Sequence, residues 1–326
     1  LFSEGRSLGT FIIGRPGSGK TSFLARQVLL EFYNEPDHAI FVLDMSGSVT
    51  DTILSILAQL KPQEREEYER RIIYDELGNK DWVIPMPELS EEYGSIEEQV
   101  QRVSFNLSRL APELVKATPF VGGLAIKEMS QHILKVAGAI ENEFGETWQI
   151  TEAKRLIWDE TTLKKALNRF GYKCPEAKYY LENVYLNQRP SEKDLQTRAL
   201  TGLLGMIETK SARARLGYYT PGWTPREVIR NGYMVIINGA PLINQPNAQH
   251  YLFTQVYSLI MQTINTRTPG DPRNNPVSLI MDEVYALIGI EGMAEEIGKI
   301  SPLYRNRKLQ LYVVLQSLSQ LAKPLD

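Results

Sequence analysis

The chain has 326 residues, of which 43% are hydrophobic and 23% are charged, and this composition excludes a disordered or fibrous protein. Its net charge of −3 and pI of about 5.9 give no overall signature of nucleic-acid binding. The single cysteine, Cys174, allows no internal disulfide and favours a reducing, cytoplasmic compartment.

The first predicted elements are a buried strand over residues 10–13, a glycine-rich loop and an amphipathic helix over residues 21–32. The loop fits the phosphate-binding pattern G-x-x-x-x-G-K-[ST], and strand–loop–helix is the context that this pattern requires. Backbone N–H groups and the helix N-terminus are expected to surround phosphates, with Lys20 reaching the β- and γ-phosphates and the Thr21 hydroxyl binding Mg²⁺. The expected cofactor-binding residues are Gly14, Arg15, Pro16, Gly17, Ser18, Gly19, Lys20, Thr21 and Ser22. We therefore predict that the chain binds ATP and Mg²⁺; the alternative is a glycine turn with a solvated lysine.

The apolar run over residues 39–43 predicts a strand of a parallel sheet that is buried on both faces. It ends in Asp44, which should lie at the sheet edge where ligands bind in open α/β folds. Helices are expected over residues 50–60 and 65–71 and a strand over residues 72–74, followed by an extended loop over 82–87 because its two prolines exclude a helix.

Helical periodicity without strand signals dominates from about residue 95 to residue 217, with predicted helices over 96–110, 124–143, 161–170, 177–186 and 192–212. This indicates an all-α insertion over residues 95–217 between two parts of a nucleotide-binding domain, residues 1–94 and 218–326. Residues 151–217 carry 13 basic and 8 acidic side chains. Each charge alone suggests a solvated helix face, whereas the asymmetry as a whole favours a nearby polyanion.

Strand signals return over residues 233–237, 277–283 and 309–315, with a helical turn over 224–230 and a long helix over 247–266. The predicted fold class is α/β, a mostly parallel sheet flanked by helices with an inserted all-α subdomain.

Acidic and amide side chains end the last two predicted strands. Nucleotide hydrolysis needs one carboxylate that orders the Mg²⁺ shell and another that polarises the attacking water, roles that we assign to Asp282 and Glu283. Both would lie next to the phosphate loop if the two strands are neighbours; the alternative is a strand that merely ends in acidic turn residues. Gln316 could sense the γ-phosphate or orient the water. Arg305 or Arg307 could be an arginine finger offered to a neighbouring subunit, or part of a basic surface turn.

This order of parts resembles the FtsK/HerA superfamily of DNA-translocating ATPases, and within it the type IV coupling proteins of conjugation. The similar features are the phosphate loop, Asp44 followed by Gly47, the helical insertion, the sequence from Thr224 to Gly232 before an apolar strand, and Gln-Ser-x-x-Gln-Leu from Gln316 onward. Coupling proteins often carry a lysine between that aspartate and glycine, where this chain has Met45-Ser46.

The resemblance implies a RecA-like fold and a hexameric ring that pumps DNA through a central pore. It also implies phosphate and magnesium roles for Lys20 and Thr21, Walker B roles for Asp282 and Glu283 and a sensor role for Gln316, and it favours Arg307 over Arg305 as the trans-acting arginine. The expected function is an ATP-driven DNA translocase in conjugation, with secretion-channel or nuclease proteins as further partners. Alternatives are a HerA-like translocase on duplex DNA in repair, defence or packaging, or a nucleotide-dependent switch or scaffold that binds proteins.

No window of 18 consecutive apolar residues occurs, so we expect no membrane-spanning helix in these residues. Because the chain begins at Leu1 rather than methionine, we expect further sequence upstream, which could carry an anchor. The expected location is the cytoplasm, or the inner face of the membrane if such an anchor exists.

Overall fold

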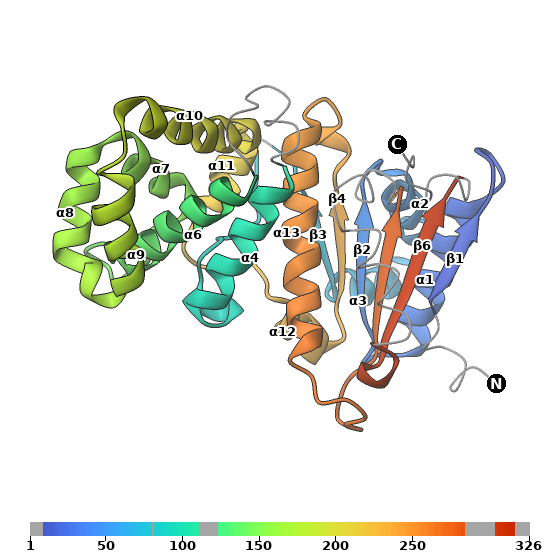
Figure 1. The fold of residues 1–326 in the computed structure, drawn as a ribbon. Coiled ribbons are helices and arrows are strands. Elements are labelled where there is room, and N and C mark those ends of the chain that lie inside the picture. The colour runs from blue at the N-terminus through green and yellow to red at the C-terminus, as the bar shows by residue number, and fades with distance from the viewer. Residues whose placement is uncertain (1–8, 80, 111–122, 284–303, 317–326) are drawn as a thin grey trace. The chain divides into compact units, whose positions relative to one another are not determined.

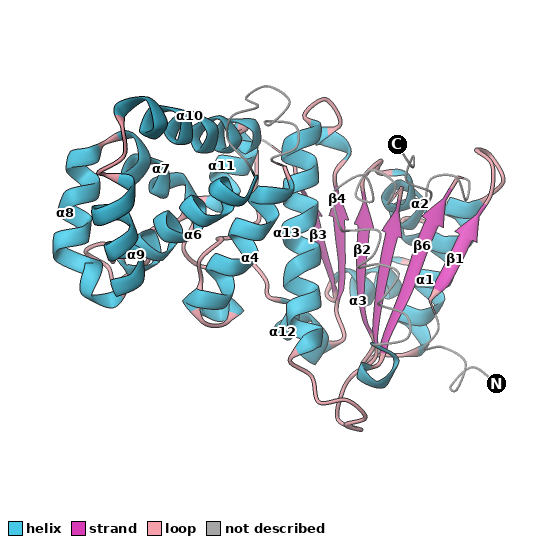
Figure 2. Ribbon diagram, viewed as in Figure 1, coloured by secondary structure: helices cyan, strands magenta, loops and turns pink. Residues whose placement is uncertain are grey.

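The computed structural model describes residues 9–79, 81–110, 123–283 and 304–316. The chain forms two compact units, one made of residues 1–79 and 225–326 and the other of residues 80–224. The insertion expected over residues 95–217 falls inside the second unit. Figure 1 colours the chain from its N-terminus to its C-terminus, and Figure 2 distinguishes the strands of the first unit from the helices of the second.

The first unit contains one six-stranded sheet in which every pairing is parallel, with the strand order β1-β6-β5-β2-β4-β3. The strands are β1 (Thr10–Ile13), β2 (Ala39–Asp44), β3 (Ile72–Glu76), β4 (Met234–Asn238), β5 (Val277–Asp282) and β6 (Leu309–Leu315). All six strands predicted from the sequence are present, and the α/β class is confirmed. Residues of β2, β4 and β5 are buried throughout, as expected for central strands covered on both faces.

Helices cover both faces of this sheet (Figure 1). They are α1 (Lys20–Asn34), α2 (Ser48–Leu57), α3 (Pro62–Glu69), α12 (Pro225–Asn231) and α13 (Pro246–Asn265). Helices α1 and α2 pack on one face, where Leu24 and Val28 of α1 and Ile53 of α2 join a core with Ile40 and Val42 of β2. Helix α13 lies on the opposite face and buries an almost continuous apolar surface. This packing holds α1, and with it the loop before it, firmly against the sheet.

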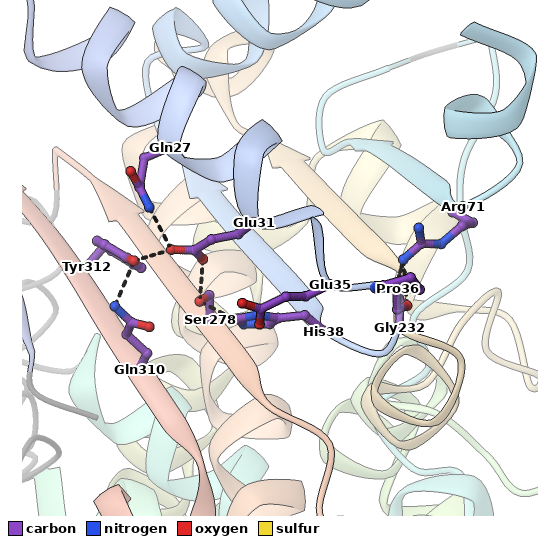
Figure 3. Close-up of polar contacts among 10 residues, drawn as sticks. All are labelled: Gln27, Glu31, Glu35, Pro36, His38, Arg71, Gly232, Ser278, Gln310 and Tyr312. Atoms are coloured by element: carbon purple, nitrogen blue, oxygen red, sulfur yellow. Dashed lines mark hydrogen bonds and ion pairs between the residues drawn. The ribbon is translucent and has the colours of Figure 1, made fainter. Parts of the chain in front are cut away.

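A buried polar cluster joins α1 to two strands beneath that core (Figure 3). The Glu31 carboxylate is only 4% exposed and accepts hydrogen bonds from Gln27, from Ser278 of β5 at 3.0 Å and from Tyr312 of β6. Ser278 in turn lies 3.0 Å from Nε2 of His38. A buried carboxylate is tolerated only when donors surround it, so this cluster ties α1 to β5 and β6 through specific contacts.

In the described residues of the second unit, the secondary structure is helical apart from an isolated β-bridge between Glu141 and Thr147. Its helices are α4 (Ile96–Arg109), α6 (Gly123–Ala139), α7 (Ile150–Trp158), α8 (Glu160–Phe170), α9 (Pro175–Tyr180), α10 (Pro190–Ile207) and α11 (Lys210–Leu216), and a π-helical turn over Leu181–Tyr185 follows α9. Helix α4 begins where Ser95 and Glu98 form a reciprocal capping box.

In this unit one helix was missed and two predicted helices were wrong in their bounds. Helix α7 was not predicted. The helix predicted over residues 192–212 is two helices, because the Thr209 hydroxyl accepts a hydrogen bond from Ala212 N at 3.0 Å and starts α11 anew. The helix predicted to reach residue 143 ends at Ala139, because Asn142 accepts hydrogen bonds from Phe144 N and Glu146 N and closes a turn instead.

No helix among the residues that the structure describes is both long enough and apolar enough to cross a bilayer.

Candidate functional site

The phosphate loop connects β1 to α1 at the carboxyl edge of the sheet. Gly17 and Gly19 have φ angles of 76° and 82°, a left-handed conformation that glycine adopts without strain. Gly19 directly precedes the first residue of α1, so the free N–H groups of that helix face the loop. Gly14 N donates to Leu315 O at 3.3 Å, which fixes the start of the loop beside the end of β6. The loop residues from Arg15 to Gly19 are exposed.

Lys20 lies across the loop that it follows. Its ammonium group donates to the carbonyl oxygens of Gly14 and Arg15, the latter at 3.0 Å. The two residues that follow it, Thr21 and Ser22, occupy the first turn of α1. The residues predicted to bind nucleotide, Gly14 to Ser22, thus lie in the loop after β1 and in the first turn of α1, next to a helix N-terminus.

The strand that carries the acidic pair is not a neighbour of the strand that precedes the phosphate loop. Strand β6 lies between β1 and β5 and pairs with both in parallel. Because two inter-strand spacings, β1 to β6 and β6 to β5, separate them, the ends of β1 and β5 lie about 10 Å apart. This distance leaves room for phosphate groups between them. Strand order depends on pairings between segments that are distant in sequence, so local periodicity could not decide it.

Gln316 directly follows β6, in the middle of this edge. Because Ile13 is the register partner of Leu315, Gln316 lies level with the first residue of the phosphate loop. It stands between that loop and the acidic residues that end β5, and its side chain is exposed. The Gln-Ser-x-x-Gln-Leu resemblance beyond Gln316 falls outside the described residues.

Asp282 and Glu283 differ in their surroundings. Asp282 is 4% exposed, accepts a hydrogen bond from Ser48 Oγ at 3.1 Å and lies beside Asp44, its register partner on β2. Burial first, and then the Asp44 carboxylate, raise the pKa of Asp282 to about 6. Burial and Asp44 also raise the pKa of Glu283, while the positive charge of Lys20 opposes that rise. Both groups therefore favour a nearby cation.

Glu283 has a φ angle of 53°, which is unusual for a residue with a side chain. Its backbone N–H donates to Asp282 Oδ1 at 3.1 Å. Strained backbone of this kind is concentrated at functional sites, where the surrounding structure holds it. The left-handed turn therefore marks Glu283, like Asp282, as a candidate site residue.

The donor set fits Mg²⁺ together with a nucleotide. Among the described residues no group of three or more His, Cys, Asp or Glu side chains is placed to hold a metal ion by itself. Mg²⁺ prefers oxygen ligands and is usually held by one or two protein groups, substrate phosphates and water. Thr21 and Asp282 supply such groups at the same sheet edge as the phosphate loop.

Arg307 lies at the opposite edge of the sheet, just before β6 begins. Since β6 has 7 residues, it separates Arg307 from Gln316 by about 23 Å. The Arg307 guanidinium donates to Arg267 O at 3.2 Å and to Asn265 Oδ1 at 3.3 Å. Arg307 therefore cannot belong to the same site as Lys20 within one chain. The side chain of Arg305 is outside the described residues.

Ser278, His38 and Glu35 follow one another in the order of a hydrolase triad, but they form no nucleophilic site. Ser278 is fully buried, and its hydroxyl proton is directed to Glu31, a carboxylate that can only accept. His38 Nε2 is then the donor to Ser278 Oγ, and Nδ1 lies 3.0 Å from Glu35. The arrangement is a structural cluster.

Much of the basic stretch in the second unit is paired with acidic side chains. Lys154 binds Glu208 at 2.5 Å, and Arg198 binds Asp194 at 2.9 Å. Further pairs are Lys164–Glu160, Lys193–Glu160 and Arg213–Glu208. These contacts reduce the positive potential that the composition of residues 151–217 had suggested.

Ser46 and Ser48 are site residues that the sequence did not identify. Both lie in the turn between Asp44 and α2, and Ser48 contacts Asp282, which is 234 positions away in the chain. The available signal was local: two hydroxyl residues directly follow a strand that ends in an aspartate at the ligand-binding edge.

No protein-family model matches the sequence, and neither does any curated protein sequence. The structure is similar to the unbound bacterial conjugative coupling protein TrwBdeltaN70, with a TM-score of 0.62 and 12% identity over 97% of this chain and 63% of that chain. TrwB in complex with the ATP analogue ADPNP gives a TM-score of 0.64 at 12% identity, with 97% and 65% covered. VirB4 of Thermoanaerobacter pseudethanolicus gives 0.54 at 14% identity, with 97% and 71% covered.

The predicted resemblance to conjugative coupling proteins is therefore confirmed at the level of the fold. The chain spans 63% to 65% of the length of the TrwB chains.

Proposed function

We propose that this chain is a Mg²⁺-dependent ATPase whose hydrolysis drives DNA movement, with conjugative DNA transfer as the context that the fold favours. One observation carries the catalytic part of this proposal: the phosphate loop, the Asp282-Glu283 pair and Gln316 meet at one edge of a parallel sheet. Support for nucleotide and magnesium binding comes from similar TrwB structures in complex with ADPNP and with ADP and Mg²⁺.

Each residue has a distinct part in this proposal. The loop N–H groups and Lys20 hold the phosphates, and Thr21 and Asp282 hold the metal. Bound Mg²⁺ would neutralise charge on the phosphates. Glu283, whose raised pKa suits a proton acceptor, orients and polarises the attacking water, and Gln316 positions that water or senses the last phosphate.

The position of Arg307 is the reason that the proposal includes a ring of several copies. Since it lies at the far sheet edge of its own chain, a catalytic role requires that it enter the site of a neighbouring copy. A ring, expected to be a hexamer, would supply this arrangement and a path for DNA. Pairing with a secretion channel or a nuclease, and a place at the inner face of a membrane, follow from the resemblance and stay predictions.

A second candidate is a nucleotide-dependent switch or scaffold that binds proteins and does not move DNA. The observation that favours it is the pairing of basic side chains in the helical unit, such as Lys154 with Glu208. A switch would turn ATP over slowly and without regard to DNA.

ATP binding and hydrolysis by single-site variants test the catalytic proposal. Lys20→Ala should lose nucleotide binding, because the phosphate charge is no longer countered. Glu283→Gln should bind ATP as the wild type does yet hydrolyse it at least 100-fold more slowly, roughly the effect of losing a general base. Hydrolysis by Glu283→Gln at the wild-type rate would contradict the assignment of Glu283.

A further inference from the structure

A chain of hydroxyl groups connects the ends of two neighbouring strands at the proposed site. It begins at Asp44, the last residue of β2, whose Oδ1 lies 3.3 Å from Ser46 Oγ. It then passes through Ser46 and Ser48 to Asp282, the last residue of β5. Asp44 and Asp282 are register partners, so two buried carboxylates lie side by side at this edge. What surrounds each carboxylate therefore decides which of them can serve a ligand.

Both carboxylate oxygens of Asp44 accept hydrogen bonds from the backbone at the start of α2. Its Oδ1 accepts a hydrogen bond from Gly47 N at 2.8 Å, and its Oδ2 accepts one from Thr50 N at 2.7 Å. These bonds satisfy free N–H groups at the start of α2, and they occupy both carboxylate oxygens of a side chain that has no solvent exposure. Asp44 thus holds the turn in place.

Asp282 has a different environment, because a side chain on another element sets its orientation. Ser48 Oγ lies 3.1 Å from Asp282 Oδ2, and Ser48 must be the donor because a carboxylate only accepts. Ser46 Oγ lies 3.0 Å from Ser48 Oγ and can donate to it in turn. The other donor to Asp282 among the described residues is the backbone N–H of the next residue, Glu283.

We propose that Ser48 is a positioning residue that fixes the orientation of the Asp282 carboxylate for metal binding. The inference rests on the proposed function, since it concerns the residue that we assign to Mg²⁺. One lone pair of Oδ2 is taken by Ser48, which leaves the remaining lone pairs in a defined direction. Ser48 itself is exposed, so water can replace a lost hydroxyl donor, but such a water is not attached to α2 and would not hold Oδ2 in one direction.

The role of Ser48 can be separated from folding. Ser48 is exposed and begins α2, but the α2 N-terminus is held by Asp44 through backbone N–H groups and not by the Ser48 hydroxyl. Loss of Ser48 Oγ therefore leaves those bonds in place. Thr52, one turn further along α2, provides a matched control because, among the described residues, its solvent-accessible hydroxyl donates to Ser48 O at 2.8 Å and to no carboxylate.

The test compares binding of a fluorescent, non-hydrolysable ATP analogue in Mg²⁺ and in EDTA. In the wild type, Mg²⁺ should tighten binding. Ser48→Ala should reduce this Mg²⁺-dependent gain by roughly 10- to 100-fold, the effect of losing a hydrogen bond that orients a charged metal ligand, and leave affinity in EDTA unchanged. Ser48→Thr should restore the gain, and Thr52→Ala should match the wild type.

A double variant identifies the partner through which Ser48 acts. In an Asp282→Asn background, Ser48→Ala should cause no further loss of the Mg²⁺-dependent gain. An equal loss in that background, or a normal gain in Ser48→Ala alone, would overturn the positioning role while nucleotide binding stands. If the wild type binds no analogue in either condition, the proposed function itself fails, and the inference fails with it.

Discussion

Glu283 shows how a single residue at the site departs from local preference. Its φ of 53° costs an ordinary residue about 1–2 kcal/mol relative to glycine. The sequence around residue 283 does not predict this conformation, because glutamate rarely adopts the left-handed backbone conformation. The sequence predicted the carboxylate and its place after β5, but not the left-handed backbone conformation that carries it.

At this position Glu283→Gly should therefore be more stable than Glu283→Ala by about 1 kcal/mol. Both variants remove the carboxylate, so the comparison isolates backbone strain. Urea denaturation without nucleotide measures the difference. The opposite order is expected at Thr52 inside α2, where glycine should be less stable than alanine by about 1 kcal/mol. If alanine is also the more stable residue at position 283, the strain is absent.

At the scale of elements, the cluster around Glu31 connects α1 to β5 and β6, the elements that lead to Lys20, Asp282 and Gln316 (Figure 3). Ser278→Ala removes a donor to a buried carboxylate and an acceptor for His38. We expect it to lower the free energy of unfolding by roughly 1–3 kcal/mol. Chemical denaturation measures this change, with Thr52→Ala, which removes a solvent-accessible hydroxyl from α2, as a control that should change little. An unchanged midpoint for Ser278→Ala would show that the cluster contributes no stability.

Glu160 joins two helices of the second unit, since it binds Lys164 of its own helix α8 at 2.7 Å and Lys193 of α10 at 2.6 Å. Hydrogen bonds from Lys164 and Lys193 lower the pKa of Glu160 to about 2. Because the folded-state pKa lies below that of the unfolded chain, the stabilisation is present above about pH 4.5 and is lost as the pH falls through 2.

Glu160→Gln should therefore reduce stability at pH 7 by at most about 1 kcal/mol, a value limited by solvent screening of exposed pairs, and the difference from wild type should vanish near pH 2. Thermal denaturation across this pH range measures the difference. A constant difference at every pH would exclude the ion pairs as its cause.

The strands were more predictable than the helices. Strands β2, β4, β5 and β6 are short apolar runs with clear boundaries, and these follow directly from burial on both faces. In the second unit the helices are broken by local side-chain caps, such as Thr209 before α11, which interrupt the backbone without interrupting apolar periodicity. The order of the strands and the contact between Ser48 and Asp282 depend on tertiary structure and could not be read locally.

At the scale of the whole molecule, Arg307 lies too far from the phosphate loop of its own chain to act there. A catalytic role for Arg307 would therefore require a neighbouring copy. If Arg307 acts in trans, Arg307→Ala and Lys20→Ala should each be inactive alone. Their mixture should regain part of the ATPase activity, because some interfaces then combine an intact loop with an intact arginine. No recovery in the mixture, although the variants co-assemble, would contradict the trans role. Full activity of Arg307→Ala alone would exclude any catalytic role.

The measurement that most directly tests the account as a whole is the steady-state ATPase rate with and without single- and double-stranded DNA. It is made at low salt, where contacts to phosphates are strongest. We predict that DNA raises the rate severalfold and that Glu283→Gln abolishes hydrolysis in every condition. The preferred form of DNA would then separate a conjugation-like from a HerA-like role. A slow ATPase rate that DNA does not change would contradict the DNA-translocase hypothesis and favour the nucleotide-dependent switch.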